Sequence, residues 1–159
     1  PEAQLDRFMI KTSIGYPSLA VAERILAGDV DRNPSGKLSP VITTKAVADM
    51  ADLAATVHVD PAVARYAAQL VESTRESDAT KLGVSVRGAI SMMRIARVVA
   101  ASQGRHYVIP DDVKALAAPV WTHRLVLDPE AEFSGTTSES VIERALGQVE
   151  APLARASAE

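Results

Sequence analysis

Apolar residues recur with helical spacing along most of the chain, and the stretch "VHVDPAVARYAAQLVESTRES" (57–77) shows this most clearly. Asp60 is a residue type that caps helices, and Pro61 suits the first helical position. The following apolar or small residues recur at i, i+3, i+4, i+7, i+8 and i+11: Val63, Tyr66, Ala67, Leu70, Val71 and Thr74. This spacing places them on one face, so it predicts an amphipathic helix with that face buried.

Similar patterns predict further helices on both sides of this stretch. Each begins at a capping residue or a proline. The predicted helices run from Ser18 to about Asp29, from Thr43 or Thr44 to about Thr56, from about Ser85 to Gln103 and Gly104, from Pro110 to a kink or an early end at Pro119, and from Thr137 or Ser138 onward. Glycine, proline and polar residues predict loops over 28–40 and 77–81. The sum is an all-α bundle of about five or six helices.

The beginning of the chain carries a different pattern, with a period of two. Apolar or β-branched residues occupy every second position there: Phe8, Ile10, Thr12 and Ile14. This alternation predicts a β-strand. A lone strand leaves its backbone groups unpaired, so we expect it to belong to a sheet outside this chain. We therefore expect a remnant of another domain over 1–15, a helical domain over 16–150 and a flexible tail over 151–159.

Composition narrows the classes of function. Aromatic residues make up only 4% of the chain, so aliphatic side chains must build the core. The absence of cysteine excludes disulfides and thiolate metal sites. The three histidines, His58, His106 and His123, lie far apart and lack ligand spacing, so no metal site is predicted. A formal net charge of -3 argues against a general nucleic-acid binder. No apolar run reaches the length of a membrane span and no targeting signal is visible, so we expect a cytoplasmic protein.

One arginine lies in the first turn of a long predicted helix, within "LGVSVRGAISMMRIAR" (82–97). A helix N-terminus already carries partial positive charge, so Arg87 is mildly unfavourable there unless an anion lies nearby. Gly83 permits a close approach, Ser85 can cap the helix, and the first helical amides are free to bind. Together these residues are compatible with a phosphate site, although a surface arginine near a helix start is also common.

Two further arginines share one side of that helix with Arg87. At about 100° per residue, Arg94 and Arg97 fall with it on a narrow ridge, whereas much of the remaining circumference is apolar. The helix is therefore expected to occupy the centre of the bundle. The ridge is either a solvated face or a phosphate-binding stripe, and the residues alone leave both interpretations open.

Three stretches of the chain resemble the C-terminal part of MoxR-type AAA+ ATPases, in the same order and at similar spacing. They are "PEAQLDRFMIKTSIGYPS", "YAAQLVESTR" and "LGVSVRGAISMMRIARVVAASQGRHYVIPDDVKALAAPVWTHRLVL". The resemblance implies a helical lid domain over 16–150, preceded by a remnant strand of the α/β AAA+ core over 1–15. It further implies an ATP-driven, chaperone-like machine, usually a hexamer, that uses ATP and Mg²⁺. The implied partners are its own core domain, neighbouring subunits and client proteins, among them proteins with metal-binding adhesion domains.

The resemblance also assigns roles to individual residues. Arg7, in "DRF", resembles an arginine finger that reaches the γ-phosphate held by the neighbouring subunit. Arg87, beside Ser85, resembles the second sensor, which contacts nucleotide from the lid of the same subunit. Tyr16, at the junction of core and lid, is a candidate for an adenine contact or for ordinary hinge packing. The family often has proline just before the position of Arg87 and alanine just after it, where this chain has Val86 and Gly88. Proline would fix the helix start, and Gly88 costs the helix up to about 1 kcal/mol relative to alanine.

The chain lacks a G-x-x-x-x-G-K-[ST] loop and an acidic strand end for magnesium. By itself it is therefore expected neither to hydrolyse ATP nor to bind it tightly, and ATP hydrolysis is expected of the full-length protein. Two other classes remain open. One is a helical nucleic-acid or adaptor module that uses the ridge of Arg87, Arg94 and Arg97, against which the acidic net charge counts. The other is a protein-interaction bundle without a nucleotide role.

Overall fold

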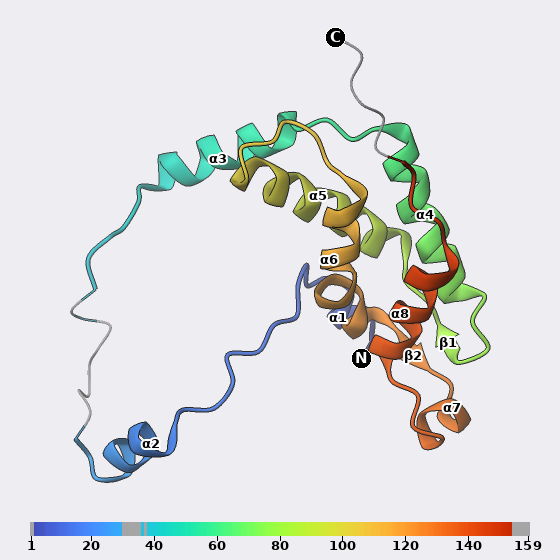
Figure 1. The fold of residues 1–159 in the computed structure, drawn as a ribbon. Helices are drawn as coiled ribbons and strands as arrows, with labels where there is room; N and C mark the ends of the chain where they lie inside the picture. The colour runs from blue at the N-terminus through green and yellow to red at the C-terminus, as the bar shows by residue number, and fades with distance from the viewer. Residues whose placement is uncertain (1, 30–35, 37, 154–159) are drawn as a thin grey trace.

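The computed structural model describes residues 2–29, 36 and 38–153, and helices dominate it (Figure 1). The all-α prediction is confirmed. Most of the predicted loop over 28–40 and of the predicted tail over 151–159 lies outside the described residues. The elements are α1 (Glu2–Leu5), α2 (Leu19–Leu26), α3 (Thr44–Thr56), α4 (Pro61–Arg75), β1 (Thr80–Leu82), α5 (Val86–Ser102), α6 (Pro110–Trp121), the 3-10 turn η2 (Thr122–Arg124), β2 (Val126–Leu127), α7 (Pro129–Phe133) and α8 (Ser138–Gln148).

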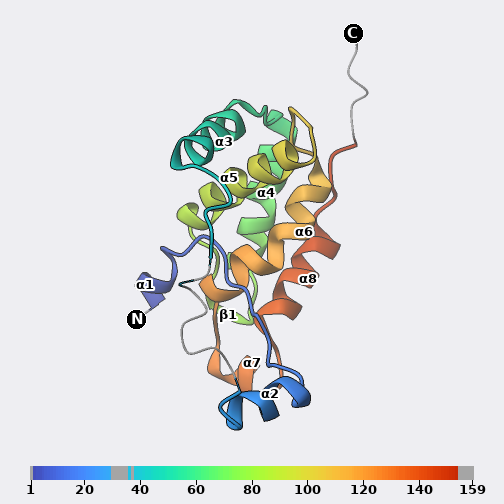
Figure 2. The same cartoon turned by 90° about the vertical axis from the view of Figure 1, so that its left-hand side faces the viewer.

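Helix α5 lies at the centre of the bundle, as expected. It packs against α6, α3 and α4, while α8 packs on α4 and α6 (Figure 2). Small side chains let the helices approach closely, since α5 buries Gly88, Ser91, Ala96 and Ala100. Within the part of the chain that the structure describes, every helix falls short of the length and apolar content needed to cross a membrane.

Helix α4 forms as its sequence pattern predicts. Asp60 Oδ1 accepts a hydrogen bond from Ala62 N at 2.7 Å, and Pro61 occupies the first turn. The side chains predicted to share one buried face are all buried: Val63, Tyr66, Ala67, Leu70, Val71 and Thr74. The helix and its orientation are confirmed, because the cap, the proline and the 3.6-residue period agree with one another.

A short two-stranded sheet joins two distant parts of the chain. Strand β1 pairs antiparallel with β2, with Thr80 opposite Leu127 and Leu82 opposite Val126. The predicted loop over 77–81 is therefore wrong for its last residues, because a three-residue strand is too short to show a period of two. Since β1 precedes α5 and β2 follows η2, the pairing holds the start of α5 beside the end of η2.

Residues 8–18 run as an extended segment and do not form the predicted strand. Lys11 N donates to Pro119 O at 2.9 Å, but no strand of the described residues pairs with this segment. The strand predicted over Phe8–Ile14 therefore does not form among the described residues, and the sheet in which it is expected to pair lies outside this chain. The segment leads to α2, which stands apart from the bundle and buries none of its residues (Figure 1).

The buried face of α4 predicts a large stability difference between two leucine truncations. Leu70 is 0% exposed, so Leu70→Ala should lower the free energy of unfolding by about 2–5 kcal/mol. Leu53, on α3, is 61% exposed, and Leu53→Ala should change it by less than about 0.5 kcal/mol. Urea unfolding followed by circular dichroism measures both values. Similar losses in the two variants would contradict the observed packing of α4.

Candidate functional site

The chain enters α5 through a close contact with α4. A Cβ on Gly83 would come within 2.7 Å of the Arg75 backbone atoms Cα and N. Next to it, Val84 N donates to Thr74 Oγ1 at 3.0 Å and Val84 O accepts from Arg75 Nε at 2.9 Å. Gly83 therefore permits a close approach, as the sequence predicts, but the approaching group is α4 of the same chain.

Ser85 caps α5 and also binds Asp6. Its Oγ accepts a hydrogen bond from Gly88 N at 3.1 Å and donates to the Asp6 carboxylate, 2.9 Å from Oδ1 and 3.0 Å from Oδ2. The cap is predicted from the sequence, whereas the contact with Asp6 is not. Two residues after Ser85, Arg87 is exposed and forms no hydrogen bond or ion pair with any described residue. Its guanidinium is thus available to an anion outside this part of the chain.

Arg124, from η2, is a buried cation with every nitrogen bonded. Its side chain is 0% exposed, and Nη1 lies 2.7 Å from Asp6 Oδ1. Nη1 also donates to Asp6 O, Nη2 donates to Phe8 O and to Ser91 Oγ, and Nε donates to Val120 O at 2.8 Å. A buried guanidinium needs both an anion and acceptors for its N–H groups, and this site supplies both. We name Asp6, Ser85 and Arg124 the clasp.

The clasp brings together two of the residues that the resemblance singled out. Asp6 directly precedes Arg7, and Ser85 lies two residues before Arg87, so the Asp6–Ser85 hydrogen bond joins the two segments. Arg7 is exposed and, like Arg87, has no bonded side-chain partner among the described residues. Tyr16 is not brought to this site, because it lies on the extended segment with its side chain 100% exposed.

The structure explains why position 88 is a glycine, which the sequence alone did not. A Cβ at this position would come within 2.6 Å of Val84 Cγ1 and 3.0 Å of Arg124 Cδ. Val84 is itself fully buried and β-branched, so it has little freedom to move. In addition, Gly88 O accepts a hydrogen bond from Trp121 Nε1 at 3.2 Å. The absence of a side chain at Gly88 therefore leaves room for the stem of Arg124.

A second ion pair holds the stretch "GRHYVIPDD" (104–112). Two nitrogens of Arg105 donate to Asp112, at 2.6 Å from Oδ1 and 2.8 Å from Oδ2. Asp112 Oδ2 also accepts from Ile109 N at 2.9 Å, which caps α6. The hydrogen bond to Asp112 raises the pKa of Arg105, so the cation is retained. Since both charges are satisfied within the chain, this pair fixes the loop onto α6 and leaves no free group for a ligand.

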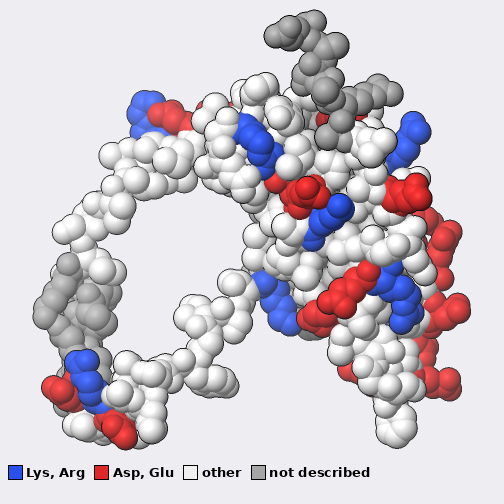
Figure 3. Space-filling model, viewed as in Figure 1, with Lys and Arg blue, Asp and Glu red and all other residues white. Residues whose placement is uncertain are grey.

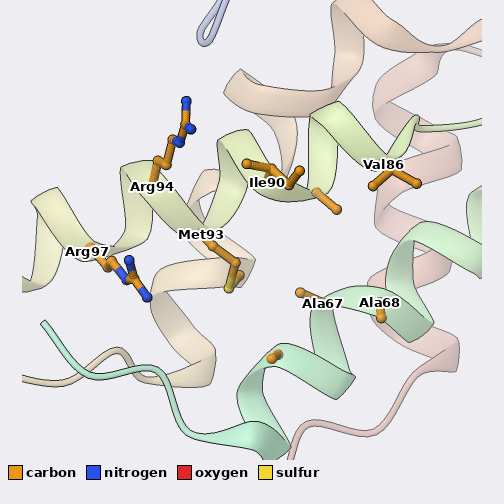
Figure 4. Close-up of a pocket in the computed structure, with 9 residues that line it drawn as sticks. Ala67, Ala68, Val86, Ile90, Met93, Arg94 and Arg97 are labelled. Atoms are coloured by element: carbon orange, nitrogen blue, oxygen red, sulfur yellow. The ribbon is translucent and has the colours of Figure 1, made fainter. Parts of the chain in front are cut away.

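The other two ridge arginines border a groove of about 300 Å³ between α4 and α5 (Figure 4). Met93 points toward α4, whereas Arg94 points away from it. The remaining lining is apolar: Ala64, Ala67, Ala68, Val86, Ala89, Ile90 and Met93. Arg87 does not line this groove. On the face drawn in Figure 3, basic and acidic side chains are interspersed without a continuous basic stripe. The apolar lining of the groove favours apolar contacts over binding along a phosphate backbone.

Sequence reasoning missed Asp6 and Arg124 as site residues. Both lie inside stretches that carry the family resemblance, "DRF" and "HRL", so the motifs mark their positions. Their ion pair, however, joins residues 118 positions apart. Helical and strand periodicities report which face of an element is buried and not which distant charges meet. Only the folded chain shows that these two residues are partners.

Comparisons with known proteins agree with this architecture. Residues 72–145 match the family described as the AAA lid domain. Protein YeaC of Bacillus subtilis is 36% identical over 157 residues, which cover 99% of this chain and 49% of YeaC. Chaperone MoxR1 of Mycobacterium tuberculosis is 32% identical over 161 residues, which cover 96% of this chain and 42% of MoxR1. The chain thus spans about half the length of these relatives.

A solved structure shares the fold. A proposed ATPase from Cytophaga hutchinsonii superimposes with a TM-score of 0.81 at 28% sequence identity. The match covers 96% of this chain and 49% of that protein. The similarity therefore extends beyond the helical bundle.

The contacts of Gly88 predict an unusual outcome for a glycine-to-alanine change in a helix. Gly88→Ala gains helix propensity of about 1 kcal/mol but forces overpacking against Val84 and Arg124, so we expect a net destabilisation of about 1–2 kcal/mol. Gly147, in α8, is the matched control, because a Cβ there meets nothing within 4 Å. Gly147→Ala should stabilise the chain by up to about 1 kcal/mol. Thermal unfolding compares the two, and stabilisation by both changes would contradict the close approach of Arg124.

Proposed function

Since this chain is the lid portion of a MoxR-type AAA+ ATPase, we propose that it serves ATP hydrolysis through two arginines. Arg87 acts as a sensor that contacts the nucleotide phosphates bound by the same subunit. Arg7 acts as an arginine finger toward the nucleotide of the neighbouring subunit. The whole machine, in this proposal, is a hexameric ring that remodels client proteins, in line with the name chaperone carried by MoxR1.

One observation supports this proposal above the others. The Asp6–Ser85 hydrogen bond joins the segment of Arg7 to the helix start of Arg87, and neither arginine is paired with a described carboxylate. By contrast, Arg105 and Arg124 are bonded to carboxylates within the chain. An exposed cation without a carboxylate partner is suited to bind an external anion, and the Asp6–Ser85 hydrogen bond keeps the Arg7 segment against the start of α5.

The residues fit the phosphate groups of ATP. Arg87 stands beside the amides of a helix N-terminus, and both features bind phosphate oxygens. Bound ATP with Mg²⁺ supplies the phosphoryl group, whose charge spreads over three equatorial oxygens during transfer. A planar, permanently charged guanidinium stabilises that charge. No cluster of three or more histidine and acidic side chains suited to a metal occurs among the described residues.

The sensor role predicts a loss of nucleotide affinity in the full-length protein. Arg87→Ala removes a charge-assisted contact worth about 1.5–3 kcal/mol, so the Kd for ATP should rise about ten- to hundredfold. Arg65→Ala is the control, because Arg65 is also exposed and unpaired within the described chain but lies on α4. Titration with a fluorescent ATP analogue measures both. Unchanged affinity and ATPase activity in Arg87→Ala would favour a protein-interaction bundle.

The finger role predicts complementation between subunits. Arg7→Ala should lower kcat by about 10³-fold or more, because the guanidinium acts in the transition state. Mixing this variant with a subunit disabled in its phosphate loop should restore activity, since the second subunit still donates Arg7. Arg144→Ala, an exposed change on α8, should leave kcat unchanged. Mixed rings that assemble without regaining activity would refute the trans role of Arg7.

A further inference from the structure

Arg124 binds the residues on both sides of Arg7. Its guanidinium donates to the backbone carbonyl and the carboxylate of Asp6 and to the backbone carbonyl of Phe8. Arg7 lies between these two anchored residues and carries an exposed side chain. The buried cation therefore fixes the backbone at residue 7 and leaves the side chain of Arg7 unobstructed.

The end of α6 and η2 also hold the residues that follow Arg7. His123 Nε2 lies 3.0 Å from Phe8 O, and Lys11 N donates to Pro119 O at 2.9 Å. Apolar packing contributes little within the described chain, because Leu5 is 51% exposed and Phe8 is 64% exposed. Helix α1 has only four residues and is too short to hold a fixed position alone. Polar contacts from the lid thus determine where Arg7 stands.

We propose that Arg124 is the positioning residue for Arg7, and that the clasp makes the finger and the sensor helix one mechanical unit. This inference rests on the proposed function of Arg7. Ser85 extends the unit to α5, because its hydroxyl binds the same Asp6 carboxylate that Arg124 holds. The start of α5 and the backbone at residue 7 are therefore held by one carboxylate.

The test uses the full-length protein in mixed rings. One subunit, the donor, is disabled in its phosphate loop and supplies Arg7, whereas the other, the acceptor, binds ATP and carries Arg7→Ala. Arg124→Lys is then placed on the donor or on the acceptor. A lysine ammonium cannot span the carbonyls of Asp6 and Phe8 as the guanidinium fork does. On the donor, we expect the restored kcat to fall by about 10²-fold with the KM for ATP unchanged.

On the acceptor, the same substitution should lower the restored kcat much less than on the donor, because that subunit no longer has a finger to position and its α5 start keeps the Ser85 cap. Arg144→Lys on the donor is the matched control and should have no effect, since Arg144 is exposed and unpaired within the described chain. Equal losses on donor and acceptor would indicate a merely structural role for Arg124 and would overturn the proposal. A parent mixture without restored activity would instead refute the trans role of Arg7.

A spectroscopic measurement tests positioning separately from hydrolysis. The chain has no cysteine, so Arg7→Cys provides a single attachment point for a spin label in it. Arg124→Lys should increase the mobility of this label and should not change a label attached through Arg144→Cys. Unchanged mobility at residue 7 would overturn the proposal whether or not Arg7 acts in trans.

A milder variant covers the case in which Arg124→Lys fails to fold. Asp6→Asn keeps the side-chain shape and both backbone acceptors, but it neutralises the carboxylate partner of Arg124 and replaces one of the two oxygens that accept from Ser85 Oγ. We expect a smaller increase in label mobility and a smaller fall in kcat, with the fall again confined to the donor. A fall that appears on the acceptor alone would contradict the proposal.

Discussion

The burial of one guanidinium constrains the rest of this site. A charge removed from water must recover its hydration energy from an anion and from hydrogen-bond acceptors. Arg124 recovers it from the Asp6 carboxylate and from the carbonyls of Asp6, Phe8 and Val120. These requirements bring the first residues of the chain onto the bundle. They also bring Asp6 within reach of Ser85.

Close packing around that guanidinium explains the small residues at the start of α5. Gly88 leaves room for the stem of Arg124, and Ser91 supplies an oxygen to its Nη2. Trp121 binds the carbonyl of Gly88 from α6, so the same turn of α5 is held from two elements. Gly83 lets the preceding loop lie against α4. The start of α5 is therefore rigid at its base, while Arg87 projects from it into solvent.

Such an arrangement separates the cations of the chain by function. Arg105 and Arg124 bind carboxylates within the bundle and stabilise the fold. Arg7 and Arg87 stand next to the clasp without a described partner, so both remain accessible for the phosphate contacts that we propose. Arg94 and Arg97 instead border an apolar groove. An apolar lining is more typical of a surface that contacts another protein than of one that binds nucleic acid.

The sequence by itself determined the helices, because caps, prolines and the 3.6-residue period are local properties: Asp60, Thr43 and Ser85 cap the helices that they predict. It also identified Arg7 and Arg87 as candidate site residues, because each lies in a short motif that can be read directly from the sequence. It did not decide the pairing of residues 8–14, since alternation describes a strand's faces but supplies no neighbour to pair with. Only the tertiary structure decided that Arg124 meets Asp6 and that Gly88 must remain small. These contacts join residues far apart in the chain, and their energy depends on burial, which no local spacing encodes.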